Sequence, residues 1–433
     1  MSRAFAQTCV VVGLGYIGLP TSVVIARAGI KVLGVDIDAR VVGLVNAGRS
    51  PFEEPHLGEA LAGLVDGGWI RAQAEPSAGD VFIIAVPTPF HGGYKPDLSY
   101  VEAATRAIAP LLRKGNLVIV ESTIPVGSIE QVARWIEMLR PDLSCARRGR
   151  AQRPDILVAH CPERVLPGDM LRELVENDRV IGGICRQSGE AGKAFYERFV
   201  TGSCIVTDAR TAELCKLSEN AFRDLNIAFA NELSDICEDF GIDVWELISL
   251  ANHHPRVNIL KPGPGVGGHC IAVDPWFIVS ALGEKARLIR EARWINSGRP
   301  RQIVRKVLGR VAEGGVRSIG CFGLAYKPDV SDLRESPAVE IVGYLARELL
   351  LLGGEIGIEV AEPFIDALPR ELAGAHNVRL VGAEQALGAD LLVMLVDHQA
   401  FRAIPAARIR GKKLVDTRGL WAGVTGESRA AFD

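Results

Sequence analysis

Residues 9–36 read CVVVGLGYIGLPTSVVIARAGIKVLGVD, and this stretch decides the fold of the N-terminal half. An apolar run at 9–12 predicts a β-strand, and Gly13, Gly15 and Gly18 form the pattern G-x-G-x-x-G before an apolar helix at 19–27. A second strand at 31–35 ends at Asp36. In this context the first glycine makes the turn, the second admits a pyrophosphate, and the third packs helix on strand. We therefore expect a Rossmann-type unit that binds NAD.

The acid at the end of the second strand decides between the two nicotinamide cofactors. Asp36 lies where a carboxylate binds the ribose hydroxyls, and it would repel the 2′-phosphate of NADP. Arg40 lies close by and leaves NADP as an alternative, although it could equally flank the adenosine. The alternative for the whole stretch is a glycine-rich turn in the core without a ligand.

The overall composition excludes several classes of protein. The chain has 433 residues, 48% apolar and 23% charged, with a net charge of −3. These values predict two or three globular domains and argue against nucleic-acid or membrane-surface binding. The nine cysteines include no C-x-x-C pair, which favours a reducing compartment over disulfides or a zinc knuckle. Residues 9–26 carry no charge, but their glycines and proline fit a strand, turn and helix better than a membrane span. We expect a cytoplasmic protein.

Hydroxyl side chains follow two further predicted strands. The strand at 80–86 leads into Pro87-Thr88-Pro89, and the strand at 117–121 leads into Ser122-Thr123. Open α/β sheets bind ligands at the carboxyl ends of their strands. We therefore expect Thr88, Ser122 and Thr123 to contact the cofactor, the alternative being capped loops before helices.

A loop that follows the strand at 156–160 contains a carboxylate and a guanidinium side by side. Residues 161–168 read CPERVLPG, so Glu163 and Arg164 lie between two prolines. They are candidates for an acid/base and an anion clamp. A surface ion pair is an equally good interpretation of the residues alone.

The longest helical pattern covers residues 209–240 and is apolar over much of its circumference, as in a buried helix. Lys216, Asn220 and Arg223 fall at i, i+4 and i+7 and so share one face. A cation, an amide and a cation on one stripe suit oxyanion binding. The alternative is a solvated stripe paired with Glu213 and Glu219. Such a helix is also a candidate bridge between domains and a dimer contact.

Residues 262–275, PGPGVGGHCIAVDP, form the most unusual loop of the chain. Glycines allow positive φ and close approach of a ligand, and prolines restrict the backbone. The loop presents Cys270, followed by Asp274, and this arrangement is typical of a nucleophilic thiol. The alternative is a tight loop before an inert buried cysteine. The adjacent His253 and His254 cannot share a helical face, so we expect no metal site.

Alternating strands and helices resume in the C-terminal part. Strands are expected at 318–322, 356–362, 389–396 and 413–416, with a helix that begins at Pro337. This pattern predicts a second doubly wound domain. Its first turn lacks the full G-x-G-x-x-G, so we expect it to bind a different nucleotide. Lys327 and Arg334 could hold phosphates, although two basic residues alone are more often surface residues.

Together, and in this order, the motifs resemble those of the UDP-glucose/GDP-mannose dehydrogenase family over residues 8–421. The motifs are GLGYIGLP, VPTPF, STIPVG, PERVLPG, the Lys216/Asn220 helix, GPGVGGHCIAVDP and FGLAYKPDVSDLRESPA. Within the family, three stretches are most similar to the enzymes that oxidise UDP-N-acetyl-D-mannosamine. Arg164-Val165 stands where the UDP-glucose enzymes typically have Phe-Leu, and it fits a sugar with an N-acetyl group.

The resemblance implies an α/β fold with two Rossmann-like doubly wound parallel-sheet domains joined by a long central helix. It implies an NAD-binding domain over residues 1–205, a central helical dimerisation and catalytic domain over 206–300, and a UDP-binding domain over 301–433. It further implies a homodimer, or a higher oligomer, with the sugar C6 between NAD and UDP. The implied reaction oxidises CH₂OH to carboxylate with two NAD⁺ through a thiohemiacetal and a thioester on Cys270.

The resemblance also implies roles for individual residues. Lys216 stabilises oxyanions and exchanges protons with Asn220 and an ordered water, Asp274 supports them, and Glu163 is the base for thioester hydrolysis. The expected substrate contacts are Arg164, Val165, Lys216, Asn220, Arg223, His254, Arg256, Gly267, Tyr326 and Lys327. The expected cofactor contacts are Gly13, Gly15, Tyr16, Ile17, Gly18, Asp36, Arg40, Thr88, Ser122, Thr123, Arg334 and Arg418. Ala272, Ser128 and Arg418 depart from the family's usual residues without removing a reacting group.

Two alternatives to UDP-N-acetyl-D-mannosamine oxidation stay open. One is the 6-dehydrogenation of UDP-N-acetylglucosamine or another UDP-hexose, because a single stereocentre is read by the shape of the pocket. The other is a non-catalytic protein that binds nucleotide sugars. The resemblance implies that the product serves surface-polysaccharide synthesis.

Overall fold

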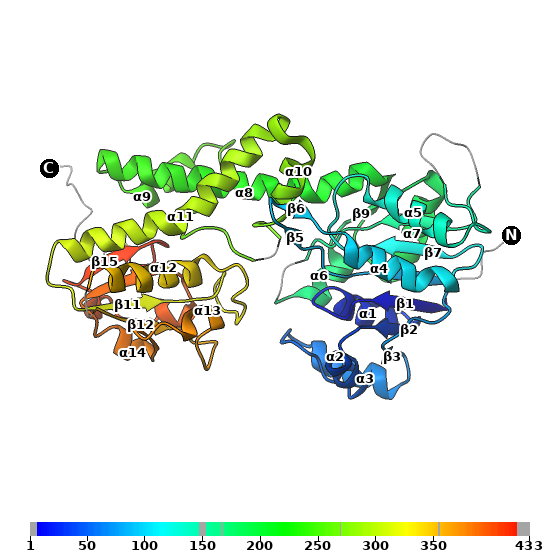
Figure 1. The fold of residues 1–433 in the computed structure, drawn as a ribbon, viewed down its shortest axis with the longest axis horizontal. Coiled ribbons are helices and arrows are strands. Elements are labelled where there is room, and N and C mark those ends of the chain that lie inside the picture. Colours follow the sequence, from blue (N-terminus) through cyan, green and yellow to red (C-terminus); the bar gives the residue numbers. More distant parts are fainter. Residues whose placement is uncertain (1–6, 147–152, 166–167, 269, 354–355, 422–433) are drawn as a thin grey trace. The chain divides into compact units, whose positions relative to one another are not determined.

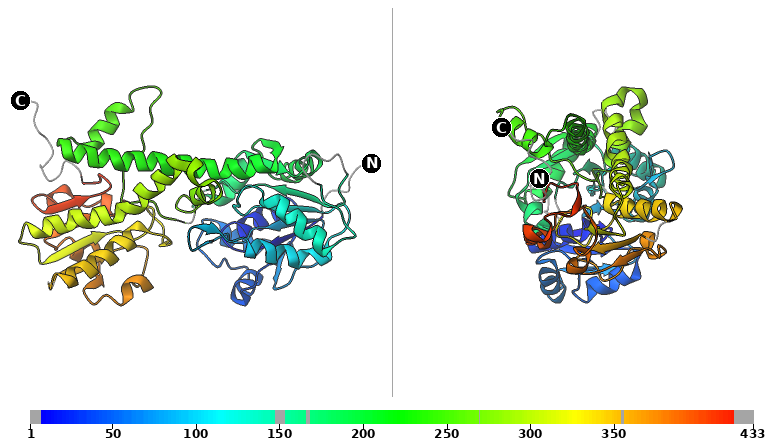
Figure 2. Two further views of the ribbon diagram at one scale, coloured as in Figure 1. Left: turned by 45° about the horizontal axis from the view of Figure 1, so that its top comes forward. Right: turned by 90° about the vertical axis from the view of Figure 1, so that its left-hand side faces the viewer.

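The computed structural model describes residues 7–146, 153–165, 168–268, 270–353 and 356–421. Two residues of the PERVLPG motif, Leu166 and Pro167, and one residue of the cysteine loop, His269, lie outside the described residues. The chain divides into two compact units, residues 1–219 and 220–433. The boundary falls within the long helix α8 (Ala209–Phe240), which Figure 2 shows as one uninterrupted helix.

An eight-stranded sheet forms the centre of the N-terminal unit, in the order β10-β9-β8-β7-β4-β1-β2-β3. All neighbouring strands are parallel except β8 and β9, which are antiparallel. The strands are β1 (Thr8–Val12), β2 (Lys31–Val35), β3 (Ile70–Gln73), β4 (Val81–Ile84), β7 (Leu117–Val120), β8 (Leu157–His160), β9 (Arg179–Gly183) and β10 (Cys204–Asp208). A separate hairpin pairs β5 (Phe90–His91) with β6 (Lys95–Pro96). The order around β1 and β4 is that of a dinucleotide-binding sheet.

Helices cover both faces of this sheet. They are α1 (Gly18–Arg27), α2 (Ala39–Asn46), α3 (Leu57–Asp66), α4 (Ser99–Ile108), the 3₁₀ turn η1 (Ala109–Leu111), α5 (Ser128–Leu139), α6 (Met170–Glu176) and α7 (Arg186–Tyr196). Cys9 and Val11 of β1 belong to the core that α1, α3 and α7 share, whereas Val10 and Val12 belong to the core with α4 and α5. A strand buried on both faces explains the continuous apolar run at residues 9–12.

The C-terminal unit is built on a smaller, fully parallel sheet of five strands in the order β13-β12-β11-β14-β15. The strands are β11 (Ser318–Phe322), β12 (Gly357–Ala361), β13 (Val378–Leu380), β14 (Leu391–Met394) and β15 (Lys413–Asp416). Helices α11 (Arg287–Ala312) and α12 (Pro337–Leu351) lie on one face and α14 (Ala383–Ala386) on the other (Figure 1). The remaining short elements are α13 (Arg370–Ala373), α15 (Gln399–Arg402) and η3 (Ala406–Arg408).

Helices α9 (Val244–Ala251), α10 (Asp274–Leu282) and η2 (Gly283–Ala286) complete the unit. The 3₁₀ turn η2 at residues 283–286 separates α10 from α11. The sequence predicts that α8 is apolar over much of its circumference, as in a buried helix, but part of this apolar surface is exposed. Phe222, Phe229 and Phe240 are 68%, 51% and 76% exposed, so one face of the helix presents aromatic rings to the surface.

The predicted fold class, two Rossmann-like α/β units with a long central helix, is confirmed. Over the described ranges, we find no helix with the length and apolar character needed to span a membrane. In the same ranges, no cluster of three or more His, Cys, Asp or Glu side chains has the arrangement of a metal site.

Candidate active site

The glycine turn after β1 has the geometry that a dinucleotide needs. Gly13 has a φ of +96°, and a Cβ there would lie 2.5 Å from the carbonyl oxygen of Ala85. A Cβ at Gly18 would lie 1.8 Å from the oxygen of Gly13, so helix and strand touch through these glycines. No protein atom lies within 4 Å of the corresponding position at Gly15, which leaves room for a ligand. Gly13 and Gly18 therefore have the turn and packing roles that the sequence predicts, and the open space at Gly15 is compatible with a ligand.

The helix and the acid next to this turn fit a bound NAD. No side chain caps α1, and its first turn contains no acidic residue, so its N-terminal N–H groups can face a phosphate. Asp36 accepts a hydrogen bond from the N–H of Leu14 at 2.9 Å and stays partly exposed, as a ribose-binding acid must be. Arg40 is exposed and lies 3.8 Å from Asp38, which caps α2. Tyr16 stacks on Phe52 with ring centroids 4.2 Å apart.

The hydroxyl residues at the neighbouring strand ends fasten the loops to each other. Thr88 Oγ1 donates to the carbonyl of Thr123 at 2.6 Å, and Ser122 Oγ donates to the carbonyl of Val86 at 2.7 Å. These bonds join the loops after β4 and β7 beside the glycine turn. The contact of these residues with the cofactor stays a prediction.

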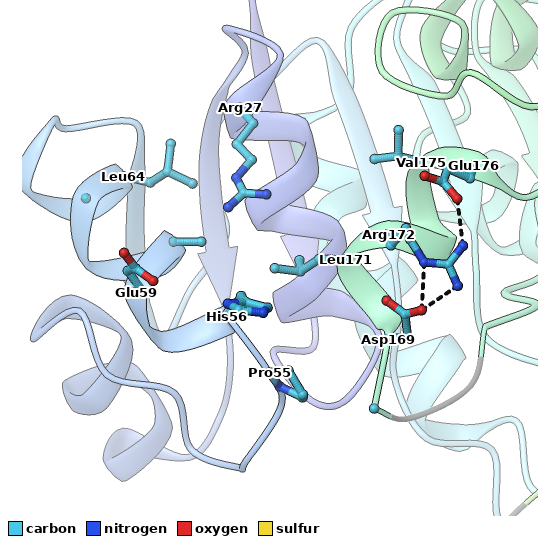
Figure 3. Close-up of a pocket in the computed structure, with 13 residues that line it drawn as sticks. Arg27, Pro55, His56, Glu59, Leu64, Asp169, Leu171, Arg172, Val175 and Glu176 are labelled. Carbon is cyan, nitrogen blue, oxygen red and sulfur yellow. Dashed lines mark hydrogen bonds and ion pairs between the residues drawn. The ribbon is translucent and has the colours of Figure 1, made fainter.

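A cavity of about 810 Å³ opens elsewhere in this unit, between α1, α3 and α6. Its walls include Arg27, His56, Leu171 and Arg172, and Figure 3 shows Arg172 held by two carboxylates of its own segment. None of the residues predicted to bind NAD lines this cavity. The glycine turn, and not this hollow, has the chemistry of a dinucleotide site.

The N-terminal unit brings Glu163, Lys216 and His160 together. Glu163 is 8% exposed, and its carboxylate accepts a hydrogen bond from the N–H of Val165. Burial raises the pKa of Glu163, and the charge of Lys216 only partly offsets this. Burial also lowers the pKa of His160 to about 4, with Lys216 as a smaller cause, so this imidazole is neutral near neutral pH. A carboxylate with a raised pKa beside an ammonium is suited to proton transfer.

Arg164 forms an ion pair with Glu219 of α8, with nitrogen to oxygen distances of 2.8 and 3.1 Å. Arg164 therefore takes part in an ion pair, as the alternative interpretation has it, but with Glu219 and not with the neighbouring Glu163. The role of Arg164 and Val165 at a sugar stays a prediction.

The cysteine loop of the C-terminal unit packs on residues 326–337 of the same unit. Gly268 has a φ of +76° and donates its N–H to the carbonyl of Arg334 at 3.1 Å. The ring of Tyr326 lies against the position that a Cβ would take at Gly268. A Cβ at Gly267 would lie 2.6 Å from the oxygen of Glu335. Two of the loop's glycines are thus required by close packing. Cys270, which follows in the loop, is a partly exposed residue.

The same unit joins Cys270 to two other predicted catalytic residues. The carbonyl of Cys270 accepts the N–H of Asp274 at 2.8 Å at the start of α10. Asp274 is 2% exposed, and its Oδ2 accepts a hydrogen bond of 2.5 Å from Nδ2 of Asn220. Asn220 lies one helical turn beyond Lys216 on α8. The buried carboxylate therefore orients the amide and anchors the turn that carries the thiol.

Other predicted residues lie at more exposed positions. Arg334 is paired with Asp332 at 2.6 Å, and Arg418 with Asp397 at 2.9 Å. The guanidinium of Arg418 also lies against Gly263 at the start of the cysteine loop. The remaining members of the predicted set, Arg223, His254 and Arg256, are exposed, and Tyr326 and Lys327 are half-buried. Arg223 thus shares its helical face with Lys216 and Asn220 but not their burial.

Reasoning from the sequence missed a buried polar network that holds the cysteine loop. Asn231 of α8 accepts the N–H of Gly263 at 2.9 Å and donates to Asn296 of α11 at 2.9 Å. Asn296 in turn donates to Asp224, which forms a 2.5 Å ion pair with Arg293. Polar residues on an otherwise apolar helix, at 224 and 231, were the only available signal.

Glu213 was considered only as a solvated partner, and that interpretation is wrong. Its side chain is fully buried and accepts the N–H groups of Gly127 and Ile129 at 2.6 and 2.8 Å, so it caps α5 in the STIPVG segment. Burial raises the pKa of Glu213 to about 7.

A Rossmann turn with an acid at the end of the second strand, a buried Glu163 close to Lys216 and a thiol in a glycine loop are the features expected of an NAD-dependent oxidoreductase. The sequence matches all three domains of the UDP-glucose/GDP-mannose dehydrogenase family: the NAD-binding domain over residues 7–200, the central domain over 210–298 and the UDP-binding domain over 320–423. The chain belongs to this family. Its cofactor is NAD, and its substrate is a nucleotide sugar.

Relatives with two different names match nearly the whole chain. The NDP-N-acetyl-D-galactosaminuronic acid dehydrogenase of Ralstonia nicotianae is 54% identical over 96% of both chains. The UDP-N-acetyl-D-mannosamine dehydrogenase of Yersinia pestis is 51% identical over 96% of this chain and 99% of its own. Among solved structures, the UDP-N-acetyl-mannosamine dehydrogenase Cap5O of Staphylococcus aureus is 41% identical, with a TM-score of 0.80 over 95% of each chain.

Proposed function

We propose that the protein oxidises C6 of UDP-N-acetyl-D-mannosamine to the carboxylate in two NAD-dependent steps, through a thioester on Cys270. The observation that carries the proposal is the cysteine loop. The partly exposed residue Cys270 follows closely packed glycines, and a buried Asn220–Asp274 pair anchors its turn. A two-electron alcohol dehydrogenase has no need of such a thiol. Four-electron oxidation needs one, because the aldehyde must stay bound between the two steps.

The residues of the chain supply the proton and acyl chemistry. C6–OH gives its proton to an ordered water beside Lys216 and Asn220, these two side chains stabilise the oxyanion, and loss of hydride gives the aldehyde. The Cys270 thiolate adds to the aldehyde, and loss of a second hydride from the resulting thiohemiacetal leaves a thioester. Glu163 then removes a proton from a water molecule that attacks the thioester carbonyl. The C–S bond breaks, which releases the carboxylate and restores the thiol. NAD, when bound at the glycine turn, accepts the hydride in each oxidation.

The electrostatics of Glu163 and Lys216 support these roles. A buried carboxyl with a raised pKa holds a proton more readily than a solvated one, as a base that must take a proton from water requires. Lys216 is 7% exposed, so its interaction with an alkoxide is weakly screened by solvent. Domain assignments at 1–205, 206–300 and 301–433, and a place in surface-polysaccharide synthesis, are part of the same proposal.

A second substrate, an NDP-N-acetyl-D-galactosamine, is favoured by one specific observation. The relative named for the galactosaminuronic acid is as similar to this chain as those named for mannosamine. UDP-N-acetylglucosamine stays as the third candidate. The shared N-acetylhexosamine fits Arg164-Val165 in the loop that carries Glu163.

The choice is tested by initial rates of NADH formation with four nucleotide sugars at equal concentration. The panel is UDP-N-acetylmannosamine, UDP-N-acetylgalactosamine, UDP-N-acetylglucosamine and UDP-glucose. The proposal expects the mannosamine compound to have the highest kcat/KM, by at least about tenfold. A higher value for the galactosamine or glucosamine compound overturns the substrate and keeps the reaction. No oxidation of any of them, with NAD bound, leaves a non-catalytic nucleotide-sugar-binding protein.

We also propose a homodimer in which the exposed aromatic face of α8 is buried. Phe222, Phe229 and Ile236 are spaced by seven residues, and Phe240 lies one turn further on. A row of apolar side chains at this spacing is typical of a helix that packs against another helix.

A further inference from the structure

The glycine turn of the N-terminal unit has a counterpart in the C-terminal unit. In the N-terminal unit, Gly13 has a φ of +96° and donates its N–H to the carbonyl of Val35 at 2.8 Å. The next N–H, of Leu14, donates to the carboxylate of Asp36 at 2.9 Å. The acid that ends the second strand thus holds the turn and stays partly exposed to a ligand.

The turn after β11 repeats these bonds. Gly323 has a φ of +93° and donates its N–H to the carbonyl of Ala361 at 2.8 Å. The N–H groups of Leu324 and Ala325 donate to Oε2 of Glu362, at 2.7 and 3.0 Å. Glu362 therefore has the structural position in this unit that Asp36 has in the first. By position alone it would be expected to bind a ribose.

The second acid differs from the first because a histidine covers it. The Glu362 side chain is 0% exposed, and its Oε2 lies 3.1 Å from Nε2 of His398, whose side chain is also 0% exposed. The other ring nitrogen, Nδ1, accepts the N–H of Asp329 at 2.9 Å. A nitrogen that accepts carries no proton, so Nε2 is the protonated nitrogen and donates to Glu362.

The two bonds of His398 hold both ends of one loop. Through Glu362 the imidazole fixes the start of the loop, at Leu324 and Ala325, and through Nδ1 it fixes Asp329. Asp329 has a φ of +59°, a conformation that a non-glycine residue adopts only when its surroundings hold it. Tyr326 and Lys327 lie between the two fixed ends.

We infer that His398 is a positioning residue. It covers Glu362, so that this acid cannot bind a ribose, and it fixes loop 324–329 so that Tyr326 and Lys327 present a rigid surface to the nucleotide sugar. This inference rests on the proposed function, in which Tyr326 and Lys327 contact that ligand. It explains how the chain uses one turn twice for different nucleotides. In the first unit the acid, Asp36, faces the ligand. In the second unit the acid, Glu362, holds the turn in place.

The hydrogen bonds around Glu362 agree with a scaffold role. Although burial alone would raise it, the pKa of Glu362 lies below its ordinary value, because His398, Leu324 and Ala325 donate to the carboxylate. A carboxylate with these bonds and the further N–H of Phe364 has no exposed oxygen left for a ligand.

The test uses His398→Ala, His398→Asn and His398→Gln in the full chain. Asn retains an acceptor at the position of Nδ1, and Gln retains a donor at the position of Nε2. The measurements are amide hydrogen exchange without ligand, Kd for UDP and for NAD, and KM and kcat for the nucleotide sugar. For the Ala variant we expect at least about tenfold faster exchange at Leu324, Ala325 and Asp329, and about tenfold weaker UDP binding. We expect NAD binding within about twofold and kcat at saturation within about threefold of the native values.

The two conservative variants test the two hydrogen bonds of His398 separately. His398→Asn should protect the Asp329 amide and His398→Gln the Leu324 and Ala325 amides, each with a part of the UDP affinity restored. The matched control is Asp390→Asn, because Asp390 holds the opposite end of β11 through the N–H groups of Arg317 and Ser318, at 2.8 and 3.1 Å. It should lower the melting temperature and leave the Kd for UDP unchanged.

Two results would overturn the inference. One is native exchange at residues 324–329 in the Ala variant. The other is an equal weakening of UDP binding in Asp390→Asn, which would make His398 merely one more stabilising residue. If the native protein binds no UDP, the proposed function fails instead, and the ligand-free exchange still decides whether His398 holds the loop.

Discussion

Cys270 is the residue on which the proposed chemistry depends. This residue is partly exposed, whereas Cys9, Cys161 and Cys321 are buried in the cores of their units, where burial raises the pKa of their thiols. A partly exposed cysteine at the end of a glycine loop is accessible to an aldehyde, and the buried cysteines are not.

Replacing Cys270 by Ser should abolish formation of the acid, because a serine hydroxyl does not trap the aldehyde as a thiohemiacetal. We expect kcat for acid production to fall by more than about 100-fold, with aldehyde captured by added hydroxylamine. Mass spectrometry of the products measures both. Cys185→Ser, at another partly exposed cysteine, is the control and should keep native activity. Native acid yield from Cys270→Ser rules out the thioester.

Glu163 should set the acidic limb of the pH profile. A base works only when deprotonated, so kcat falls as the pH falls through its pKa, and the raised pKa moves this limb above the range of a solvated Glu. Glu163→Gln should remove the limb and slow turnover by about 100-fold or more, with a burst of NADH as thioester accumulates. Glu176→Gln, at an exposed carboxylate on α6, is the control. An unchanged limb in Glu163→Gln would show that another group is the base.

Glu213 should make stability depend on pH in a defined window. Its folded pKa of about 7 lies above the ordinary value of 4.5, so between these values the folded protein binds more protons than the unfolded chain. This group therefore makes the free energy of unfolding decrease as the pH rises through the window. Glu213→Gln should flatten the decrease, as measured by denaturant unfolding at several pH values. An equally steep decrease in the variant contradicts the assignment.

At the scale of elements, α8 supports the cysteine loop through Asn231. Replacement by Ala leaves the N–H of Gly263 and the amide of Asn296 without their partner in a buried site. The expected cost is about 1–3 kcal/mol, together with a lower kcat because the loop that carries the thiol loosens. Thermal unfolding and steady-state kinetics measure the two effects. Asn226→Ala, at a less buried amide on the same helix, should change neither; equal effects in both variants would contradict a special role for Asn231.

Elements with strong local patterns could be predicted from the sequence. Helix α8 has the predicted bounds, 209–240, and so do β2, β11 and β15. Strands β3, β9, β10 and β13 were not predicted, because β3, β10 and β13 are only partly buried and β9 contains the charged, buried Arg179. The antiparallel pairing of β8 with β9 was not predicted either, since a strand pattern does not show direction.

The motifs expected to carry the chemistry could be predicted from the sequence, but the residues that hold these motifs in place could not. Gly13, Gly15, Gly18 and Asp36 have a fixed spacing with a known physical reason, so their geometry followed from the pattern. Glu213 and Glu362 support turns through partners that are 86 and 38 residues away. Such bonds depend on tertiary packing, and a lone acid in a helix or after a strand gives no signal for them.

At the scale of the whole molecule, the exposed aromatic face of α8 predicts an oligomer. Phe229→Glu introduces a charge in the middle of that face and should shift the protein to monomers, as measured by sedimentation at micromolar concentration. Leu351→Glu is the control, because Leu351 is 81% exposed on α12 and lies outside this face. A dimer that persists in Phe229→Glu places the interface elsewhere.

The whole molecule uses one architecture, a Rossmann-like unit, for two tasks. The first unit keeps its turn open and its acid exposed for NAD, and the second buries its acid as part of a loop. The proposed reaction needs both units, because hydride transfer would depend on the NAD of one and acyl transfer on Cys270 of the other. Loss of either function should therefore stop acid formation.

The most direct test of this account is the number of NADH molecules formed for each UDP-N-acetylmannosamine consumed, with the product identified by mass. The account predicts two NADH and a uronic acid, because the aldehyde stays bound to Cys270 until its second oxidation. One NADH with released aldehyde would contradict the central claim and define a two-electron alcohol dehydrogenase.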